Sequence, residues 1–294
     1  MSPPANTAND RVAQLASHLS SVGSSLKDKI CIVTGAGSLL GIGRATVYAL
    51  AKRGPKAIYV TDLYDTNLGD LAQEIRKLGI DCIPKAVDAG SETAIKELVN
   101  DAMAAYGRLD VFFANAGVAT GSRLHDEDEK SFMFMMRVNA LSAFLGIKYA
   151  SLAMKETGKG GKEKSGGSII CTASVAGIRS GAGSPEYSAS KAAVINLCQT
   201  GASQLAGTDI RVNAICPGLI ETGMTKTTFD FARERGSTHK IGQLNPTKRY
   251  GIAAEIAAVV AFVASEEASY VNGQALAVDG GLSSSHPIVP GKFH

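Results

Sequence analysis

The sequence lacks the signature motifs of several common enzyme classes. It contains no Gly-x-x-x-x-Gly-Lys-Ser/Thr, which argues against a P-loop nucleoside triphosphatase, and no Gly-x-Ser-x-Gly, which argues against a serine hydrolase. The five histidines include no His-Glu-x-x-His motif and no pair at helical spacing. We therefore predict no metal site.

Features of nucleic-acid-binding and membrane proteins are also missing. A net charge of +3 over 294 residues is nearly balanced, so nothing indicates a nucleic-acid partner. No apolar run approaches the ~18 residues of a membrane-spanning helix. The N-terminus lacks the basic-then-apolar layout of a secretory signal. We expect a cytoplasmic protein that acts on a small molecule.

The cysteines form no recognisable disulfide or metal pattern. They are odd in number and widely spaced, and none belongs to a Cys-x-x-Cys motif. This usage is typical of unpaired, buried thiols in a reducing compartment. The five are Cys31, Cys82, Cys171, Cys198 and Cys216.

Short apolar runs alternate with helical patterns along most of the chain. Strands are predicted at 29–34, 57–61, 80–87, 109–114, 168–172, 210–215 and 274–278. The intervening helices are predicted at 42–52, 66–78, 91–106, 131–156, from just before Tyr187 onward, and 253–264. Strands that alternate with helices predict an α/β doubly wound Rossmann fold: a mainly seven-stranded parallel sheet with helices on both faces. We predict a single domain over residues 26–284, an N-terminal extension (1–25) and a C-terminal tail (285–294).

Two segments within this pattern are polar. Asn139 lies inside the predicted helix 131–156, either as a buried hydrogen-bonding group or as an exposed neutral residue. Residues 157–168 are rich in glycine and lysine and contain no apolar residue, which predicts a solvated loop.

A glycine-rich loop follows the first predicted strand. Gly35, Gly37, Gly41 and Gly43 precede an Ala-rich helix. Strand, glycine loop and helix N-terminus together form the arrangement that binds a pyrophosphate, because the helix start offers free N–H groups.

An acid ends the second predicted strand. Asp62 can accept hydrogen bonds from a ribose 2′-OH and would repel a 2′-phosphate, although it could instead be a helix cap or turn acid. Leu40 stands where a basic residue could have bound that phosphate, and Arg44 can simply face the helix exterior. The sequence therefore favours NAD over NADP.

Polar residues gather at the carboxyl ends of the strands, where such sheets bind ligands. Asn115-Ala116-Gly117 follows the fourth strand, Ser174 the fifth, and Cys216-Pro217-Gly218 the sixth. We expect all three segments at one edge of the sheet.

Tyr187 and Lys191 are four residues apart, which places them on one face of a helix. A free tyrosine has a pKa of about 10, and lowering it to about 7 requires roughly 4 kcal/mol. A cation about 4–5 Å away supplies about 3–4 kcal/mol at an effective dielectric of about 20. Lys191 would nearly suffice to make Tyr187 a proton donor and acceptor for alcohol–carbonyl chemistry. Tyr-x-x-x-Lys alone is, however, common on helices.

Taken together, the motifs resemble those of the short-chain dehydrogenase/reductase family across nearly the whole chain. The resemblance rests on Thr34-Gly35 with Gly41-Ile42-Gly43, Asp88, Asn115-Ala116-Gly117, Asn139, Ser174, Tyr187-x-x-x-Lys191, Pro217-Gly218 with Thr222, and Val278-Asp279-Gly280-Gly281.

The resemblance implies roles for individual residues. Tyr187 is the general acid/base, Lys191 lowers its pKa and holds the nicotinamide ribose, Ser174 binds the substrate oxygen, and Asn139 helps hold a water that links Lys191 to solvent. Cofactor contacts are implied for Gly35, Gly37, Leu40, Gly41, Ile42, Gly43, Asp62, Asp88, Ala89, Asn115, Ala116, Gly117, Tyr187, Lys191, Pro217, Gly218, Ile220 and Thr222. The implied reaction interconverts a secondary alcohol and a ketone by hydride transfer. The family also implies a homo-oligomer, a dimer or tetramer, that pairs through the helices carrying Asn139 and Tyr187.

The sequence departs from the family pattern in three places. Five residues separate Gly35 from Gly41 where three are usual, so either the loop bulges or Gly37 replaces the first glycine. Glu186, directly before Tyr187, is expected to be exposed. The tail is expected to pack on a neighbouring subunit near the mouth of the active site.

The substrate pocket is expected to be lined by residues 118–121, 178–184 and 219–244. The last span contains apolar residues, which fit an apolar cyclic or aromatic substrate, and basic residues, which fit an acidic one. Alternatively, the apolar residues simply pack a lid helix while the basic residues face water. Two other functions stay open: an NADPH-dependent carbonyl reductase, and a dinucleotide-binding protein without turnover. A methyltransferase would have no use for Tyr-x-x-x-Lys.

Overall fold

The computed structural model describes residues 25–286. The predicted N-terminal extension, up to residue 24, and the tail from residue 287 lie outside the described residues, and so does the predicted packing of that tail. No described helix has the length and apolarity to cross a membrane.

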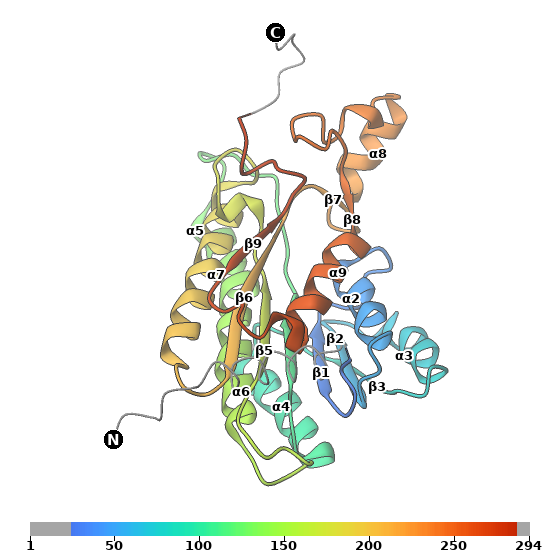
Figure 1. Ribbon diagram of the computed structural model, residues 1–294. Helices are drawn as coiled ribbons and strands as arrows, with labels where there is room; N and C mark the ends of the chain where they lie inside the picture. Colours follow the sequence, from blue (N-terminus) through green and yellow to red (C-terminus); the bar gives the residue numbers. More distant parts are fainter. Residues whose placement is uncertain (1–24, 287–294) are drawn as a thin grey trace, which may run out of the picture.

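Seven parallel strands form one sheet in the order β3-β2-β1-β4-β5-β6-β9 (Figure 1). They are β1 (Ile30–Thr34), β2 (Ala57–Asp62), β3 (Asp81–Ala86), β4 (Val111–Ala114), β5 (Gly167–Thr172), β6 (Ile210–Pro217) and β9 (Ala275–Val278). A short second sheet pairs β7 (Ile220–Glu221) with β8 (Gly251–Ile252). The sequence-based prediction of a doubly wound, seven-stranded parallel sheet is confirmed.

Helices cover both faces of the sheet. The longer helices are α2 (Ile42–Ala51), α3 (Leu68–Arg76), α4 (Glu92–Tyr106), α5 (Glu129–Met135), α6 (Ser142–Lys155), α7 (Pro185–Gln204), α8 (Lys226–Glu234) and α9 (Ala253–Ala264). Short helical turns are η1 (Met136–Leu141), η2 (Val175–Gly177), η3 (Thr238–Lys240) and η4 (Glu266–Ala268). One core packs the sheet against α4, α6 and α7, and the other packs it against α2, α3 and α9.

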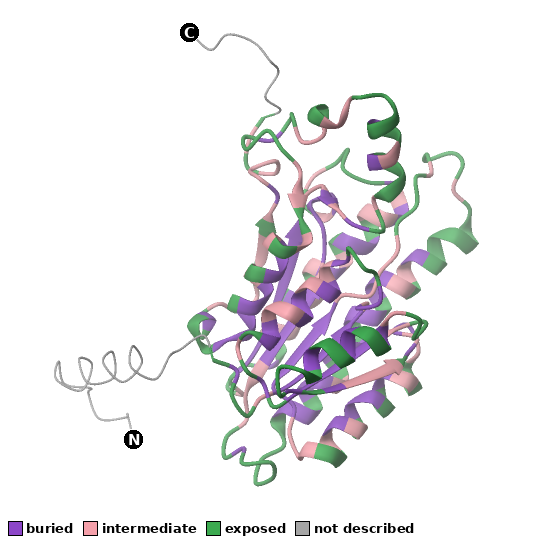
Figure 2. Ribbon diagram, turned by 90° about the vertical axis from the view of Figure 1, so that its right-hand side faces the viewer, coloured by how far each residue is buried: buried purple, intermediate pink, exposed green. Residues whose placement is uncertain are grey.

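The strands carry the core on both sides. In β1, Ile30 and Ile32 belong to the first core, whereas Cys31 and Val33 belong to the second. Strands buried on both faces are apolar at nearly every position, which explains why their sequences read as continuous apolar runs. Figure 2 shows the buried residues concentrated along the strands and on the inner sides of the helices. All five cysteines are unpaired and buried.

The predicted helix 131–156 is three consecutive helical segments. α5 ends at Met135, a π-helical turn covers Met136–Leu141, and α6 begins at Ser142. A π turn holds an extra residue within a helix and often occurs at functional sites. Asn139 lies in this turn and is 1% exposed, so it is a buried group rather than an exposed one.

One prediction about the loop 157–168 was wrong. Lys162 is buried, and its ammonium donates hydrogen bonds to the carbonyl oxygens of Leu109, Met154 and Gly166 at 3.0, 2.9 and 2.8 Å. The Lys162 side chain turns inward because these three carbonyls, which belong to two buried residues and one partly buried glycine, need a hydrogen-bond donor. The rest of the loop is largely exposed.

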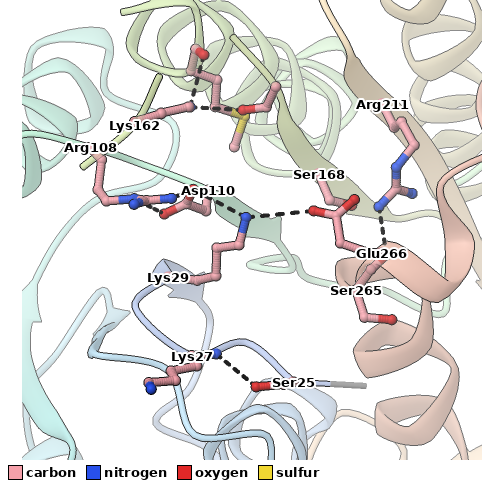
Figure 3. A network of polar contacts seen from close by, with 12 residues as sticks. Ser25, Lys27, Lys29, Arg108, Asp110, Lys162, Ser168, Arg211, Ser265 and Glu266 are labelled. Carbon is pink, nitrogen blue, oxygen red and sulfur yellow. Dashed lines mark hydrogen bonds and ion pairs between the residues drawn. The ribbon is translucent and has the colours of Figure 1, made fainter. Parts of the chain in front are cut away.

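This lysine belongs to a polar network at the amino ends of the strands (Figure 3). Arg108 binds Asp110 through two hydrogen bonds, and Lys29 lies between Asp110 and Glu266. Arg211 donates to the carbonyl oxygens of Val263, Ser265 and Val271. The network borders a cavity of about 780 Å³ at the edge of the sheet opposite the predicted site. Lys29 and Arg108 pair with carboxylates there, whereas Lys162 and Arg211 are bound by backbone carbonyls.

Candidate functional site

The glycine loop connects β1 to α2. Gly35 has φ +69°, and a Cβ on it would lie 2.8 Å from the Cα of Ala116. A Cβ on Gly43 would lie 2.2 Å from the carbonyl oxygen of Gly35. Gly35 therefore keeps the place of the first glycine, and the two extra residues bulge outward as the exposed Leu39 and Leu40.

The N-terminus of α2 faces this loop without a polar side chain to cap it. Gly41 is the N-cap residue, and the first turn, which includes Ile42, contains no acid. The first N–H groups of a helix have no partner within it and favour an anion. The loop thus provides close backbone approach and free donors, which fit a pyrophosphate.

Asp62 closes the loop from the end of β2. Its Oδ2 accepts a hydrogen bond from the Gly37 N–H and its Oδ1 accepts one from the Leu63 N–H, both at 2.8 Å. Asp62 therefore acts as a turn acid, and its carboxylate lies beside the loop as a ribose-binding acid would. Gly37 has no room for a side chain, because a Cβ would meet this carboxylate at 2.9 Å.

Arg44 lies between two helices rather than on the helix exterior. It is 8% exposed, it donates to the carbonyl oxygen of Asn67, and it lies 3.8 Å from a carboxylate oxygen of Glu74. Its guanidinium also lies over the ring of Tyr48. These contacts hold Arg44 in the α2–α3 interface.

Asn115 joins the ends of three strands. Its Nδ2 donates to the carbonyl oxygens of Thr34 and Gly35, both at 3.1 Å, and its Oδ1 accepts from the hydroxyl of Thr172. The Thr34 hydroxyl in turn accepts from the N–H groups of Asn115 and Ala116. The sequence analysis did not assign these contacts to Thr34 or Thr172, although each of them ends a strand.

Asn139 reaches across to the segment after β4 and to α7. Its amide exchanges two 2.9 Å hydrogen bonds with the backbone of Val118 and donates to the hydroxyl of Ser190 at 3.0 Å. A Cβ on Gly117 would lie 3.0 Å from Asn139 Oδ1 and 3.4 Å from Lys191 Nζ. Gly117 therefore leaves room where these two polar groups approach each other. Ser190, next to Lys191, was not predicted as a site residue.

Ser174, Tyr187 and Lys191 come together at the carboxyl end of β5. Ser174 follows β5 and accepts a hydrogen bond from the Ala176 N–H, and its hydroxyl lies close enough to the Tyr187 side chain to lower the pKa of that phenol. Lys191 Nζ lies 5.6 Å from the Tyr187 ring centroid and donates to the carbonyl oxygen of Thr172 at 2.8 Å. The three predicted catalytic side chains therefore share one small region.

Burial dominates the protonation of this group. Burial raises the pKa of Tyr187 above its ordinary value, and the Ser174 hydrogen bond opposes this effect. Burial also lowers the pKa of Lys191 to about 8. In this structure burial is the largest influence on the pKa of Tyr187, and the Lys191 ammonium is itself desolvated, so the expectation that Lys191 nearly brings the pKa of Tyr187 to neutrality stays a prediction.

Asp88 and Ala89 follow β3 at the same edge. The Asp88 carboxylate accepts from the Gly90 N–H at 2.9 Å and pairs with Arg137 at 2.5 Å. The hydrogen bond from Arg137 holds the pKa of Asp88 below its ordinary value. Ala89 is buried in the first core.

The segment after β6 also lies at the carboxyl edge of the sheet. Gly218 packs against Asp279, where a Cβ would meet the Asp279 Cα at 2.7 Å. Pro217 ends β6, Ile220 is buried in β7, and the Thr222 N–H donates to the Thr225 hydroxyl at 3.0 Å. The structure thus places every predicted site residue at the carboxyl edge of the sheet or in the segments just beyond it.

Glu186 differs from its prediction. It was expected to be exposed but is fully buried, and its Oε1 accepts hydrogen bonds from the hydroxyls of Ser184 and Thr120. The carboxylate can be buried because two hydroxyl donors, Thr120 in the segment after β4 and Ser184 at the start of α7, replace its water.

The region beyond β7 contains α8 and η3, in the span where a lid was expected. Phe229 of α8 is buried and its ring stacks edge-on with Tyr250 at 4.8 Å, whereas Phe231 and Met224 are about half exposed. Arg233 pairs with Glu221 and Asp230. One apolar residue thus packs the helix, and two others stay about half exposed, with the Arg235 guanidinium stacked on the Phe231 ring. No group of three or more His, Cys, Asp or Glu side chains that could hold a metal occurs within residues 25–286.

Known proteins resemble this chain over most of its length. A family profile described as "Enoyl-(Acyl carrier protein) reductase" matches residues 35–283. The chain is 37% identical to 3-oxoacyl-[acyl-carrier-protein] reductase FabG of Thermotoga maritima, over 87% of this chain and 98% of that protein. It is 36% identical to (-)-isopiperitenol/(-)-carveol dehydrogenase, mitochondrial, of Mentha piperita, over 87% of this chain and 94% of that one.

A levodione reductase is similar in both sequence and structure. The enzyme of Leifsonia aquatica is 34% identical over 88% of this chain and 96% of its own length. A crystal structure of levodione reductase superposes with a TM-score of 0.80 at 32% identity, covering 89% of this chain and all of that one.

Proposed function

The chain belongs to the short-chain dehydrogenase/reductase family and is an oxidoreductase of that family, and we propose that Tyr187 is its general acid/base. In this proposal the chain interconverts a secondary alcohol and a ketone. The observation that carries it is the meeting of Ser174, Tyr187 and Lys191 beside the glycine loop. When bound, a nicotinamide dinucleotide supplies the hydride acceptor or donor for such a reaction.

The glycine loop fits the dinucleotide. The uncapped start of α2 would hold the pyrophosphate, and Asp62 would accept from the adenosine ribose. The backbone of Asn115, Ala116 and Gly117 would flank the cofactor, and residues from Pro217 to Thr222 would approach its amide side. Lys191 has one acceptor among the described residues, the Thr172 carbonyl, so its other donors are available to ribose hydroxyls.

Proton transfer is assigned to the Tyr187 hydroxyl. Ser174, which lies beside the Tyr187 side chain, would hold the substrate oxygen next to that hydroxyl and stabilise charge on it. Asn139 would fix the segment at Val118 against α7, and its role in holding a water beside Lys191 stays a proposal.

Replacement of Tyr187 by phenylalanine tests the mechanism. Tyr187→Phe should retain cofactor binding, measured by fluorescence titration, and lose turnover by about 10²–10⁴-fold, the usual contribution of general acid–base catalysis. Tyr270→Phe is the matched control, because Tyr270 is fully exposed, and should behave as wild type. Full activity in Tyr187→Phe would contradict the assignment of Tyr187 as the general acid/base.

We propose NAD as the preferred cofactor. Asp62 would repel a 2′-phosphate, and Arg44, the basic residue nearest the loop in sequence, is held by Asn67 and Glu74. Wild type should show a lower KM for NAD than for NADP, and Asp62→Ser should narrow that difference. A lower KM for NADP in wild type would instead support the alternative, an NADPH-dependent carbonyl reductase.

The proposed substrate is a small apolar alcohol or ketone, with a cyclic or aromatic one fitting best. The half-exposed Met224, Phe231 and Leu244 support this choice, and the pairing of Arg233 with two acids speaks against an acidic substrate. A panel of secondary alcohols, followed by the absorbance of the reduced nicotinamide, would identify the class. A dinucleotide-binding protein without turnover would bind the cofactor and oxidise none of them.

We further propose a cytoplasmic homo-oligomer, a dimer or tetramer, with residues 26–284 as the catalytic domain and residues 1–25 and 285–294 as extensions. The five unpaired cysteines support a reducing compartment. Oligomer formation is supported by large apolar side chains on the outer side of α5, η1 and α6, between 38% and 57% exposed: Phe132, Met133, Phe134, Leu141, Phe144 and Leu152.

A further inference from the structure

The helix that carries Tyr187 begins in an unusual way. Ser184 is the N-cap residue of α7, and its hydroxyl makes no hydrogen bond to the N–H groups of the first turn. An N-cap serine usually accepts such a bond and thereby fixes the start of the helix. Here the hydroxyl donates instead to Oε1 of Glu186, the second residue of α7. The first turn, which also contains Tyr187, therefore depends on the Glu186 carboxylate.

The same carboxylate oxygen binds the segment after β4. The Thr120 hydroxyl donates to Oε1 of Glu186 and lies 3.4 Å from the Ser184 hydroxyl. Both hydroxyls come from spans that we expect to line the substrate pocket, 118–121 and 178–184. A single oxygen atom of Glu186 thus joins these two spans to each other and to the catalytic helix.

Glu186 needs both hydroxyl donors. The residue is fully buried, and its Oε2 has no hydrogen-bond partner among the described residues. Burial is the largest influence on the pKa of Glu186 and raises it, but the hydrogen bonds from Ser184 and Thr120 act against burial, and the pKa lies below its ordinary value. Because a buried carboxylate that loses a donor is costly, the charge keeps both hydroxyls close.

Ser184 is preceded by a glycine that packs against the Tyr187 ring. A Cβ on Gly183 would lie 2.7 Å from Cδ1 of Tyr187 and 3.1 Å from the Cβ of Ala176. The backbone at Gly183 therefore lies directly against the phenol ring, with no space for a side chain between them. When Glu186 holds Ser184, it also holds the backbone that contacts Tyr187.

The segment after β4 is bound to α7 at a second point. Asn139 exchanges hydrogen bonds with the backbone of Val118 and donates to Ser190 of α7. Thr120, two residues further along, is bound through Glu186. A segment held at one point can still rotate about it, whereas two points fix its direction. The contact with Glu186 therefore sets how residues 118–120 lie relative to Tyr187.

We propose that Glu186 is a positioning residue for the reaction: its carboxylate holds Thr120 and Ser184 together, so that the spans 118–121 and 178–184 keep a fixed spacing around Tyr187. Glu186 acts through these neighbours rather than by contact with substrate or cofactor. The inference rests on the proposed function for its kinetic consequence. The attachment of residues 118–121 to α7 does not depend on turnover.

Removal of the Thr120 hydroxyl tests this role with little change in shape, because Thr120 is itself exposed. Thr120→Val should lower kcat/KM for the best substrate of the alcohol panel by about 10–100-fold, since a misplacement of about 1 Å can cost about 10²-fold. The affinity for the cofactor alone, measured by fluorescence titration, should stay that of wild type. Thr120→Ser, which keeps the hydroxyl, should recover most of the loss.

Two further variants separate this contact from a general effect on the helix. Thr200→Val makes the same replacement at an exposed position of α7 and should have wild-type kinetics. In a Glu186→Ala background, which lacks the acceptor, Thr120→Val should cost little further activity, because both changes remove one interaction. A wild-type kcat/KM in Thr120→Val, or losses that multiply in the double variant, would overturn the proposal.

A measurement without catalysis keeps the two proposals distinguishable. Amide hydrogen exchange of residues 118–121 and of the first turn of α7 should be faster in Thr120→Val than in wild type, and unchanged in Thr200→Val. Equal exchange in Thr120→Val and wild type would refute the attachment even if no substrate were ever found. Faster exchange in a protein that turns over no alcohol would refute only the proposed reaction.

Discussion

Two buried lysines show how the same side chain serves two purposes. Burial lowers the pKa of both Lys162 and Lys191 to about 8. Lys162 uses all three of its donors on backbone carbonyls, whereas Lys191 is bound to the single carbonyl of Thr172 among the described residues. Lys162 is therefore structural, and Lys191 has donors left for a ligand.

Removal of the Lys162 ammonium should destabilise the protein without affecting catalysis. Lys162→Met leaves three carbonyls, buried or nearly so, without their donor, and we expect the free energy of unfolding to fall by about 2–4 kcal/mol. Urea unfolding measures this change. Lys164→Met, two residues along the same loop and exposed, should be neutral. Equal stability of the two variants would contradict a structural role for Lys162.

Where a motif defined single residues, the sequence predicted which of them lie together, and their catalytic roles stay a prediction. Ser174, Tyr187 and Lys191 follow from spacing and from strand ends. The burial of Glu186 could not be predicted, because it depends on Thr120, which is 66 residues away in sequence. Lys162 was missed for the same reason: its acceptors come from three separate segments, and composition alone predicts a solvated loop.

Among the elements, the start of α9 depends on a carboxylate. Glu255 accepts from the Ile252 N–H at 3.0 Å and binds Arg249 through two hydrogen bonds. The Arg249 hydrogen bond, followed by that of Ile252, lowers the pKa of Glu255 to about 2. A carboxylate that accepts from the first N–H groups of a helix stabilises its N-terminus.

The pH dependence of this cap has a definite sign. Because the folded pKa of Glu255 lies below its ordinary value of 4.5, the contribution to stability is present above about pH 4.5 and is lost as the pH falls toward 2. Glu255→Gln should lower the free energy of unfolding by about 1 kcal/mol at neutral pH, a value limited by solvent screening. The difference from wild type should shrink on acidification.

Urea midpoints from neutral pH down to the acid limit of the folded protein would measure this difference. Glu97→Gln, an exposed acid within α4, is the control and should leave the midpoints unchanged. A Glu255→Gln effect that stayed constant down to the acid limit would show that the carboxylate charge is not responsible.

Element types and their order followed from the sequence, and most boundaries were right within a few residues. The alternation of apolar runs with helical patterns suffices for this, because each strand is buried on both faces. The path of the glycine loop could not be predicted from the sequence. The bulge depends on the contact of Gly35 with Ala116 and on the Asp62–Gly37 hydrogen bond, and both join segments that are far apart in the sequence.

At the scale of the whole molecule, the two helical layers differ in their outer surfaces. The layer with α4, α6 and α7 carries Tyr187 and Lys191, which we propose as catalytic, and α5 continues through η1 into α6 (Figure 1). Large apolar side chains remain exposed on α5, η1 and α6, although their exposure to water does not stabilise a monomer. A second subunit would bury them.

Disruption of this surface should produce a monomer. Phe144 is 43% exposed in α6, and Phe144→Asp would place a charge in the proposed interface. Sedimentation velocity should show an oligomer for wild type and a smaller species for the variant. Leu78→Asp, at a 60% exposed position after α3, should sediment as wild type. A monomeric wild type, or an unchanged Phe144→Asp, would contradict the proposed interface.

The π turn Met136–Leu141 makes this part of the chain sensitive to the insertion or deletion of a residue. Each residue of a helix rotates the segments on either side by about 100° relative to each other. The extra residue therefore sets the helical phase of α5 against that of α6, and with it the directions of Asn139 and of the exposed apolar residues. Substitutions in the turn keep this phase, whereas deletion of one residue would restore a regular helix and turn α5 away from α7. The orientation of Asn139 thus depends on the number of residues in the π turn as well as on their identity.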